Sequence, residues 1–267
     1  MKQLDIAEIK SLQIDILKIL DSFCIANNIK YSIAYGTLIG ALRHKGYIPW
    51  DDDIDVIMMR SDYELFLKEF NNFDSRYAVV STESHPQFYA PYANVFMTNT
   101  ILEEDNSHWV TMGIKIDVFP IDHVPDNKYC RKFLFSLATG LKYLVGFRNE
   151  KSYRGKGIAH IICAKISKLL LGNTNPSLCL SNLAKWSNER FKKSSSINNI
   201  VWCAAGEKGT FKMSDFSDVE RMQFEDSMYN VLNGYHNFLF CHYGNYMELP
   251  SVEKRINNHT FKAWIKD

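Results

Sequence analysis

Hydrophobic residues at helical spacing open the chain, and shorter alternating runs follow them. The helical spacing belongs to five residues: Ile6, Ile9, Leu12, Ile16 and Leu20. This spacing predicts an amphipathic helix over about residues 5–27. Residues 29–36 then form a β-rich run, and residues 37–46 have helical character up to Gly46, a typical residue after a helix end. We therefore expect a helix, a strand and a second helix in this order.

Further strands and one more helix follow. Three runs read as strands, the last of them up to Pro120: residues 53–59, 76–82 and 112–122. Ser61 stands three residues before Glu64, which is the spacing of a capping box, so a helix is expected over residues 61–72. Helices mixed with neighbouring strands indicate a small sheet domain over residues 1–125.

The second half of the chain has the pattern of helices. Four segments carry it: residues 131–147, 157–172, 178–193 and 220–244. We therefore expect an α+β fold, with a small mixed β-sheet core and flanking helices over residues 1–125. A mainly helical subdomain, residues 126–267, is expected to pack on that core.

Composition and charge narrow the class of protein. The chain has 267 residues, 46% of them hydrophobic, and a net charge of +1, which gives no general attraction to nucleic acid. No signal-peptide pattern opens the chain and its six cysteines form no CxxC pair, so a cytoplasmic protein with reduced thiols is expected. A zinc site of His236, Cys241 and His242 is an alternative to ordinary packing of these side chains.

An acidic cluster is the first candidate for chemistry. It lies in GTLIGALRHKGYIPWDDDIDV, residues 36–56. On a strand Asp51, Asp53 and Asp55 share one face, and neighbours at i and i+2 stand about 6.5–7 Å apart. Asp53 and Asp55 can therefore converge on one hard cation, Mg²⁺ or Mn²⁺. An EF-hand would need glycine where Val56 stands, and a plain charged loop is the remaining alternative.

A third acid is expected on another strand. In GIKIDVF, residues 113–119, isoleucine and valine alternate with Lys115 and Asp117. Asp117 therefore lies on the polar face of a half-buried strand. If that strand lies beside Asp53 and Asp55, the three acids suit one or two metal ions that act on a phosphate.

The glycines before the acids suggest an anion site. Gly36 and Thr37 stand where a strand turns into a helix, and the first amides of a helix attract phosphate. The alternative is that Gly36 and Gly40 only permit close packing. Arg43 and Lys45 are candidates to neutralise phosphate charge, or are a solvated helix end.

Several blocks of the chain together resemble one known family. They are YGTLIGALRHKGYIPWDDDIDV and GIKIDVFPID, followed by FED, YGNYMELP and EKRINNH. Over about residues 10–260 these blocks resemble the LicD family of phosphotransferases, which belongs to the nucleotidyltransferase-fold group. The resemblance implies transfer of phosphocholine from CDP-choline, or of another phospho-alcohol, to a bacterial surface glycan. Lipopolysaccharide and teichoic acid are such acceptors.

The resemblance also implies roles for single residues. It places Asp53 and Asp55 as metal ligands and Asp117 as the third acid. It places Gly36 and Thr37 at the phosphate-binding turn. One departure is Asn94, which stands where a lysine would be usual, so one of three other cations is expected to contact phosphate: Arg43, Lys45 or Lys115.

Further residues are candidates for substrate contact. A choline head favours aromatic faces, and four aromatics are candidates, although each is also a normal core residue: Trp50, Tyr89, Tyr92 and Trp109. Arg255 and His259 would share one face of a helical tail and grip the nucleotide or the acceptor, unless they form a surface pair. Glu225 is expected either to reach the active site or only to favour a helix start.

Three functions stay open at this point. The first is transfer of phosphocholine or a similar phospho-alcohol from a CDP-alcohol to a glycan or lipid-linked glycan. The second is nucleotidyl transfer to a small hydroxyl compound, and the third is a non-catalytic nucleotide- or metal-binding module. The basic helices around Lys142, Lys165 and Lys168 either rest on the inner face of a membrane or are merely solvated.

Overall fold

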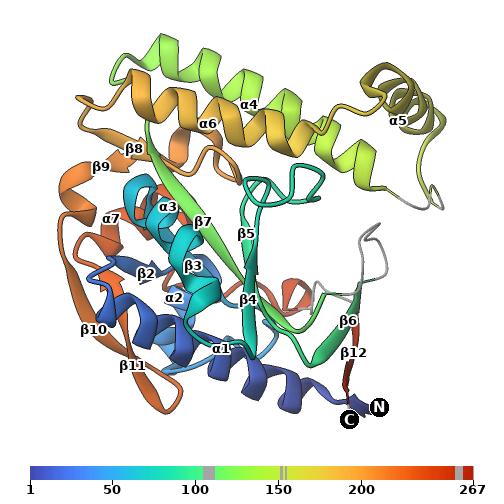
Figure 1. Ribbon diagram of the computed structural model, residues 1–267. Helices are drawn as coiled ribbons and strands as arrows, with labels where there is room; N and C mark the ends of the chain where they lie inside the picture. The colour runs from blue at the N-terminus through green and yellow to red at the C-terminus, as the bar shows by residue number, and fades with distance from the viewer. Residues whose placement is uncertain (105–111, 151–152, 154, 256–260, 267) are drawn as a thin grey trace.

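The computed structural model describes residues 1–104, 112–150, 153, 155–255 and 261–266 (Figure 1). The helices are α1 (Ile6–Ala26), α2 (Tyr35–His44), α3 (Arg60–Glu69), α4 (Lys128–Asn149), α5 (Ile158–Leu171), α6 (Pro176–Arg190) and α7 (Tyr235–Tyr243). The first strands are β1 (Lys2–Leu4), β2 (Tyr31–Ile33), β3 (Asp55–Met59), β4 (Tyr77–Val80), β5 (Ala93–Met97), β6 (Thr100–Glu104) and β7 (Lys115–His123). The later strands are β8 (Ser196–Asn198), β9 (Phe211–Lys212), β10 (Val219–Phe224), β11 (Ser227–Leu232) and β12 (Phe261–Ile265). The chain therefore has the α+β fold that the sequence predicts.

A mixed sheet forms the centre of the molecule. Its strand order is β2-β3-β7-β5-β4, in which β3 and β7 are parallel and the other pairs are antiparallel. The far end of β7 also pairs with β8, and β8 pairs with β9. The expected strands at 53–59 and 112–122 are thus confirmed and are direct neighbours.

Helices α1 and α3 pack together by aromatic contacts. The ring of Phe23 on α1 meets Phe66 on α3 edge to face, with ring centroids 5.7 Å apart, and Phe70 at 5.2 Å. A capping box of Asp5 and Glu8 begins α1. Helices α4 and α6 run side by side on another side of the molecule, and α5 projects from the end of α4 (Figure 1).

The helix expected over residues 220–244 is wrong for its first half. Residues 219–232 form the antiparallel hairpin of β10 and β11, and only α7 is helical. Tyr229 and Val231 on β11 are buried at the two-residue spacing of a strand, and Phe224 at the end of β10 is buried as well. The backbone amide of Leu232 donates to Ser32 Oγ at 2.9 Å, so β11 is bound to the central sheet. A partner distant in sequence therefore decides the conformation of this segment.

Two boundaries also differ from the expectation. Helix α3 begins at Arg60, so Ser61 lies inside the helix and is not its cap. Strand β7 continues through Pro120. Pairing with β5 stops at Val118 and pairing with β8 starts at Asp122, so no strand on that edge needs the missing amide hydrogen of Pro120.

The expected division of the chain at residue 125 stays a prediction. Residues 126–267 contain α4 to α7 and also strands β8 to β12. Strand β12 pairs with β1 and β6, which brings the two ends of the chain together (Figure 1). None of the helices in the described part of the chain combines the length and apolar character needed to cross a membrane.

A buried ion pair joins β7 to the start of α3. Arg60 Nε lies 2.7 Å from Asp122 Oδ1, and a second guanidinium nitrogen lies 2.8 Å from Oδ2. The side chains are 4% and 0% exposed. Burial alone would lower the pKa of Arg60, but the charge and hydrogen bonds of Asp122 outweigh it and raise that pKa. The pair is therefore a buried contact between two charges, and removal of either side chain would leave the other charge buried without a partner.

We predict that Arg60→Met destabilises the protein strongly. The substitution leaves the carboxylate of Asp122 buried without its cation, which costs about 3–5 kcal/mol in the free energy of unfolding measured by urea titration. The matched control is Arg76→Met, which breaks the exposed pair of Arg76 with Asp74. The control should cost less than about 1 kcal/mol. Equal losses for the two variants would contradict the prediction.

Candidate active site

Three neighbouring strands bring the polar residues of the site together. Asp55 on β3 is the register partner of Asp117 on β7, and Asn94 on β5 is the partner of Asp117 on its other side. Because side chains alternate along a strand, the three register partners project from the same face of the sheet. Asp117, which is 62 residues beyond Asp55 in sequence, is thus its direct neighbour in space.

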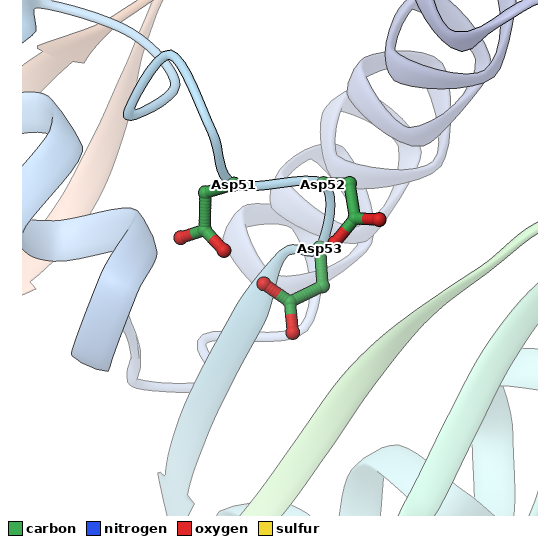
Figure 2. A group of neighbouring side chains, drawn as sticks. All are labelled: Asp51, Asp52 and Asp53. Carbon is green, nitrogen blue, oxygen red and sulfur yellow. The ribbon is translucent and has the colours of Figure 1, made fainter. Parts of the chain in front are cut away.

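The other acids lie in the loop that leads into β3. Figure 2 shows Asp51 and Asp53 pointing to one side of this loop and Asp52 pointing away from them. Among the described residues, these three offer carboxylate oxygens within 4.8 Å of one another. Burial alternates from Asp51 to Val56, and the odd positions are half-buried. This alternation agrees with the shared face predicted for Asp51, Asp53 and Asp55, although β3 begins only at Asp55.

Two buried polar side chains hold this loop in place. The side-chain amide of Gln13 on α1 donates to the backbone oxygen of Asp52 at 3.0 Å and to that of Lys115 at 3.3 Å. The hydroxyl of Thr37 accepts the backbone N–H of Asp55 at 2.9 Å. Gln13 therefore ties the acidic loop to β7, and Thr37 ties the start of β3 to α2.

The start of α2 is covered by a carboxylate. A Cβ atom at Gly36 would lie 2.4 Å from Oδ2 of Asp51, so a larger residue there would displace this carboxylate from the start of α2. A carboxylate is favourable at a helix N-terminus. A Cβ at Gly40 would lie 2.4 Å from the backbone oxygen of Gly46, which agrees with the close-packing explanation for that glycine. The phosphate role of Gly36 and Thr37 stays a prediction.

A hydrogen-bonded group surrounds Asp117. Its Oδ1 accepts from the amide of buried Asn94 at 2.6 Å and from Lys115 Nζ at 3.3 Å. Lys115 Nζ also donates to the hydroxyl of Tyr89 at 3.0 Å, and that hydroxyl donates to Asn94 Oδ1 at 2.9 Å. Asn94, which stands where the family resemblance led us to expect a lysine, thus orients the third acid, while Lys115 brings a positive charge to it.

The other two expected cations are placed differently. Arg43 donates to the backbone oxygens of Tyr246 and Glu248, so it fastens the carboxyl-terminal segment. Lys45 is exposed in a left-handed turn at the end of α2. Of the three candidates, Lys115 is the one that contacts an acid of the site.

The electrostatics of the acids favour a cation. Burial raises the pKa of Asp55, and the neighbouring charges of Asp53, Asp117 and Asp51 raise it further, with a smaller opposite effect of Lys115. Clustered oxygen donors with too much negative charge fit a hard divalent ion. The metal roles of Asp53, Asp55 and Asp117 stay predictions that this donor set supports.

Glu225 stabilises a loop behind the acids. It lies in the turn between β10 and β11 with a φ of 54°, and not at a helix start. Its carboxylate accepts the backbone N–H of Tyr47 at 2.9 Å, and its own backbone N–H donates to the backbone oxygen of Lys45 at 2.7 Å. A Cβ at Gly46 would lie 2.1 Å from Glu225 Oε1. Glu225 therefore binds the loop between α2 and β3.

Two of the expected aromatic residues line a cavity of about 170 Å³ beside the hydrogen-bonded residues around Asp117. Tyr89 and Tyr92 line it with Trp202 and Lys142. Tyr92 packs on Phe119 with ring centroids 4.3 Å apart, and Lys142 Nζ lies 4.6 Å from the centre of the Trp202 ring. The cavity therefore offers aromatic faces next to Lys115 and Asp117.

The remaining candidates lie elsewhere. The guanidinium of Arg255 lies 5.5 Å from the ring centre of Trp50, so these two candidates pack on each other. Trp109 and His259 lie outside the described residues. His236, Cys241 and His242 make separate contacts with Tyr246, Asn237 and the backbone of Phe238, so the structure supports ordinary packing and not a shared zinc site.

Two residues of the site escaped the sequence interpretation. Gln13 lies on the apolar stripe of α1, between buried Ile9 and Leu17, and a polar residue on such a stripe was the signal that could have found it. Trp202 lies in a segment without regular pattern, so only the tertiary structure brings it to Tyr92.

The comparisons with known proteins agree with this geometry. A sheet that places acids on adjacent strands beside a helix start defines a nucleotidyltransferase-like domain, and residues 28–139 match the family model described as "LicD/FKTN/FKRP, nucleotidyltransferase domain". The chain is 30% identical over 271 residues to the lipopolysaccharide cholinephosphotransferase LicD of Haemophilus influenzae, covering 99% of this chain and 100% of that protein. The chain belongs to the LicD family.

Shorter matches link the chain to two further proteins. It is 39% identical over 80 residues to an uncharacterized protein of Rickettsia typhi, which is 28% of this chain and 26% of that protein. It is 56% identical over 43 residues to an uncharacterized protein of Rickettsia prowazekii, 16% of each chain. These matches are similarities of segments and carry no function.

We predict that the free energy of unfolding of the metal-free protein falls as the pH rises, because Asp55 ionises beside other carboxylates. The pKa of Asp55 is higher in the folded state than its value of about 4 in the unfolded state. At any pH between these two pKa values the folded protein keeps a proton on Asp55 that the unfolded protein has released. Stability in EDTA should therefore fall as the pH rises through the folded pKa. Thermal midpoints between acid and neutral pH measure this.

Asp53→Asn should make this fall shallower and raise the midpoint at neutral pH. The variant removes one neighbouring negative charge from Asp55, and about 1 kcal/mol corresponds to roughly 2–4 °C. Glu189→Gln, an exposed position on α6, is the control and should change neither quantity. An Asp53→Asn protein that melts at a lower temperature than the parent would show that Asp53 does not repel Asp55.

Proposed function

We propose that this protein transfers phosphocholine, or a similar phospho-alcohol, from a CDP-alcohol to a hydroxyl of a bacterial cell-surface glycan. The observation that carries the proposal is the pairing of Asp55 with Asp117 on adjacent strands, next to the Asp51–Asp53 loop. It is supported by the full-length similarity to a lipopolysaccharide cholinephosphotransferase. The acceptor would be the glycan itself or a lipid-linked form of it.

Asp53, Asp55 and Asp117 would hold Mg²⁺ or Mn²⁺ in this proposal. A bound ion of this kind neutralises the diphosphate of the donor and stabilises the leaving oxygens. Asp51 lies close enough to take part, because its carboxylate oxygen belongs to the same group as that of Asp53. Burial and the crowding of like charges together raise the pKa of Asp55, which is expected of such a site without its ion.

The chain's own residues would orient the reacting groups. The oxygen of the acceptor hydroxyl forms a bond to the phosphorus nearest the alcohol, the bond from that phosphorus to CMP breaks, and CMP leaves with the electron pair. Asp117, oriented by Asn94, would accept the hydroxyl proton. If Asp117 instead shares in ion binding, the proton would pass to the phosphate of the departing CMP. Lys115 would contact a phosphate oxygen beside it, and Tyr89 and Tyr92 would face the choline head.

The second candidate is nucleotidyl transfer from a nucleoside triphosphate, since the same acids serve that reaction. The two differ in product: CMP for phosphocholine transfer and pyrophosphate for nucleotidyl transfer. A non-catalytic binding module would release neither.

We predict that purified protein with Mg²⁺ and CDP-choline, or another CDP-alcohol, releases CMP only when surface glycan is added. Asp53→Asn and Asp117→Asn should each lower kcat about 100-fold or more, because each removes charge that acts in the transition state. Chromatography of the nucleotides gives the rates, and the thermal midpoints show whether the variants are folded.

The control for this assay is Glu189→Gln, which should keep the rate of the parent. Pyrophosphate from a triphosphate would support the alternative function. The proposal fails if no CDP-alcohol gives glycan-dependent CMP.

We predict that Lys115→Met raises the KM for the CDP-alcohol about tenfold or more, since a charge-assisted hydrogen bond contributes roughly 1.5–3 kcal/mol. Lys45→Met is the comparison. Lys45 is also a candidate from the sequence, but its side chain is exposed, whereas Lys115 contacts Asp117. Steady-state kinetics with varied donor separate KM from kcat. The reverse result, a raised KM only for Lys45→Met, would move the phosphate contact to α2.

A further inference from the structure

The outward side of α5 is apolar. Five large side chains on it are half or more exposed, at 78%, 51%, 51%, 82% and 80%: Ile158, Ile162, Ile166, Leu169 and Leu170. We call these five residues the α5 outer face. They recur at spacings of three and four residues, so they form one stripe, whereas Ala164 on the opposite side is fully buried. A helix of a soluble domain normally exposes polar residues, so this stripe indicates a contact surface.

The segment around this stripe carries an unusual charge. Residues 128–171, which contain α4 and α5, have ten lysines or arginines and one glutamate, a net charge of +9. The whole chain has a net charge of +1, so the rest of the chain carries −8. Seven of the ten cations belong to α4 and α5 and three to the residues between these helices. The positive charge is thus concentrated in the segment that includes the exposed stripe, and it complements an anionic surface.

The α5 helix is also connected to the candidate active site. Lys168 Nζ on α5 donates to the backbone oxygen of Glu150, directly after α4, and His160 lies 2.8 Å from the carboxylate of Glu150. At the end of α4, the side chain of Asn149 donates to the backbone oxygen of Tyr89 at 3.0 Å. Tyr89 in turn contacts Lys115 beside Asp117, so a chain of hydrogen bonds leads from the end of α4, next to α5, to the candidate active site.

We propose that the α5 outer face docks on an anionic membrane surface. Exposed isoleucines and leucines beside lysines are the composition of helices that lie in the plane of a bilayer interface, where apolar side chains enter the acyl boundary and lysines meet lipid phosphates. Docking would bring the active site to a lipid-linked acceptor. This role of the docking surface rests on the proposed function. A second copy of the chain is the competing occupant, because the remaining −8 charge could also attract the basic segment.

Sedimentation of the full-length protein with vesicles tests this proposal. The protein should bind vesicles of phosphatidylcholine mixed with phosphatidylglycerol, bind phosphatidylcholine alone far more weakly, and dissociate as salt is raised. Ile162→Glu combined with Ile166→Glu should weaken binding about tenfold or more. The matched control is Ile25→Glu combined with Leu65→Glu, two exposed positions on α1 and α3, which should bind as the parent does.

Two further measurements separate the outcomes. The α5 variant should release CMP with a soluble glycan at the parent rate and lose activity only with a lipid-linked acceptor in vesicles. Absence of vesicle binding, or equal weakening by the control variant, overturns the proposal, as does a parent dimer that the α5 variant converts to a monomer without any vesicle binding. Vesicle binding without CMP release from any donor would leave the docking surface in place and remove the proposed function.

Discussion

The parallel pairing of β3 with β7 is the contact on which the candidate site depends. It makes Asp55 and Asp117 register partners, and a shift of one residue would send one of the two carboxylates to the opposite face of the sheet. Several contacts fix this register from outside the two strands. Thr37 accepts the amide of Asp55, Gln13 bridges the acidic loop and β7, and the buried pair of Arg60 and Asp122 joins the far end of β7 to the helix after β3.

The acids are held against their mutual repulsion by neutral and cationic neighbours. Burial and nearby carboxylates raise the pKa of Asp55, so the assembled cluster is unfavourable without a counterion. Asn94 and Lys115 offset part of this cost at Asp117. Local destabilisation of this kind is common where a protein must bind a ligand, and the surrounding fold compensates for it.

The helices beyond the sheet act on the site through the backbone of Tyr89. Asn149 from the end of α4 and Ser177 from the start of α6 both donate to its oxygen, and Asn175 caps α6 while it binds the preceding backbone at Phe88. These contacts place the hydroxyl of Tyr89 against Lys115 and Asn94. Helix α4 also belongs to the basic segment of residues 128–171, so substrate positioning and contact with an anionic surface would both depend on this helix.

The sequence by itself determined the elements whose pattern is local. The spacing of apolar residues fixes which side chains share a face. It therefore predicts the amphipathic helix α1, the strand around Asp55 and the polar face that carries Lys115 and Asp117. The motif also indicated the family, which the full-length similarity confirms. Tertiary structure alone decided the contacts between segments distant in sequence. Only packing against β2 makes residues 219–232 a hairpin, only the strand order places Asn94 on Asp117, and only the folded loop explains Gly36 by the carboxylate of Asp51. These outcomes depend on partners that compete for the same backbone and side-chain groups, and local spacing contains no information about which partner prevails.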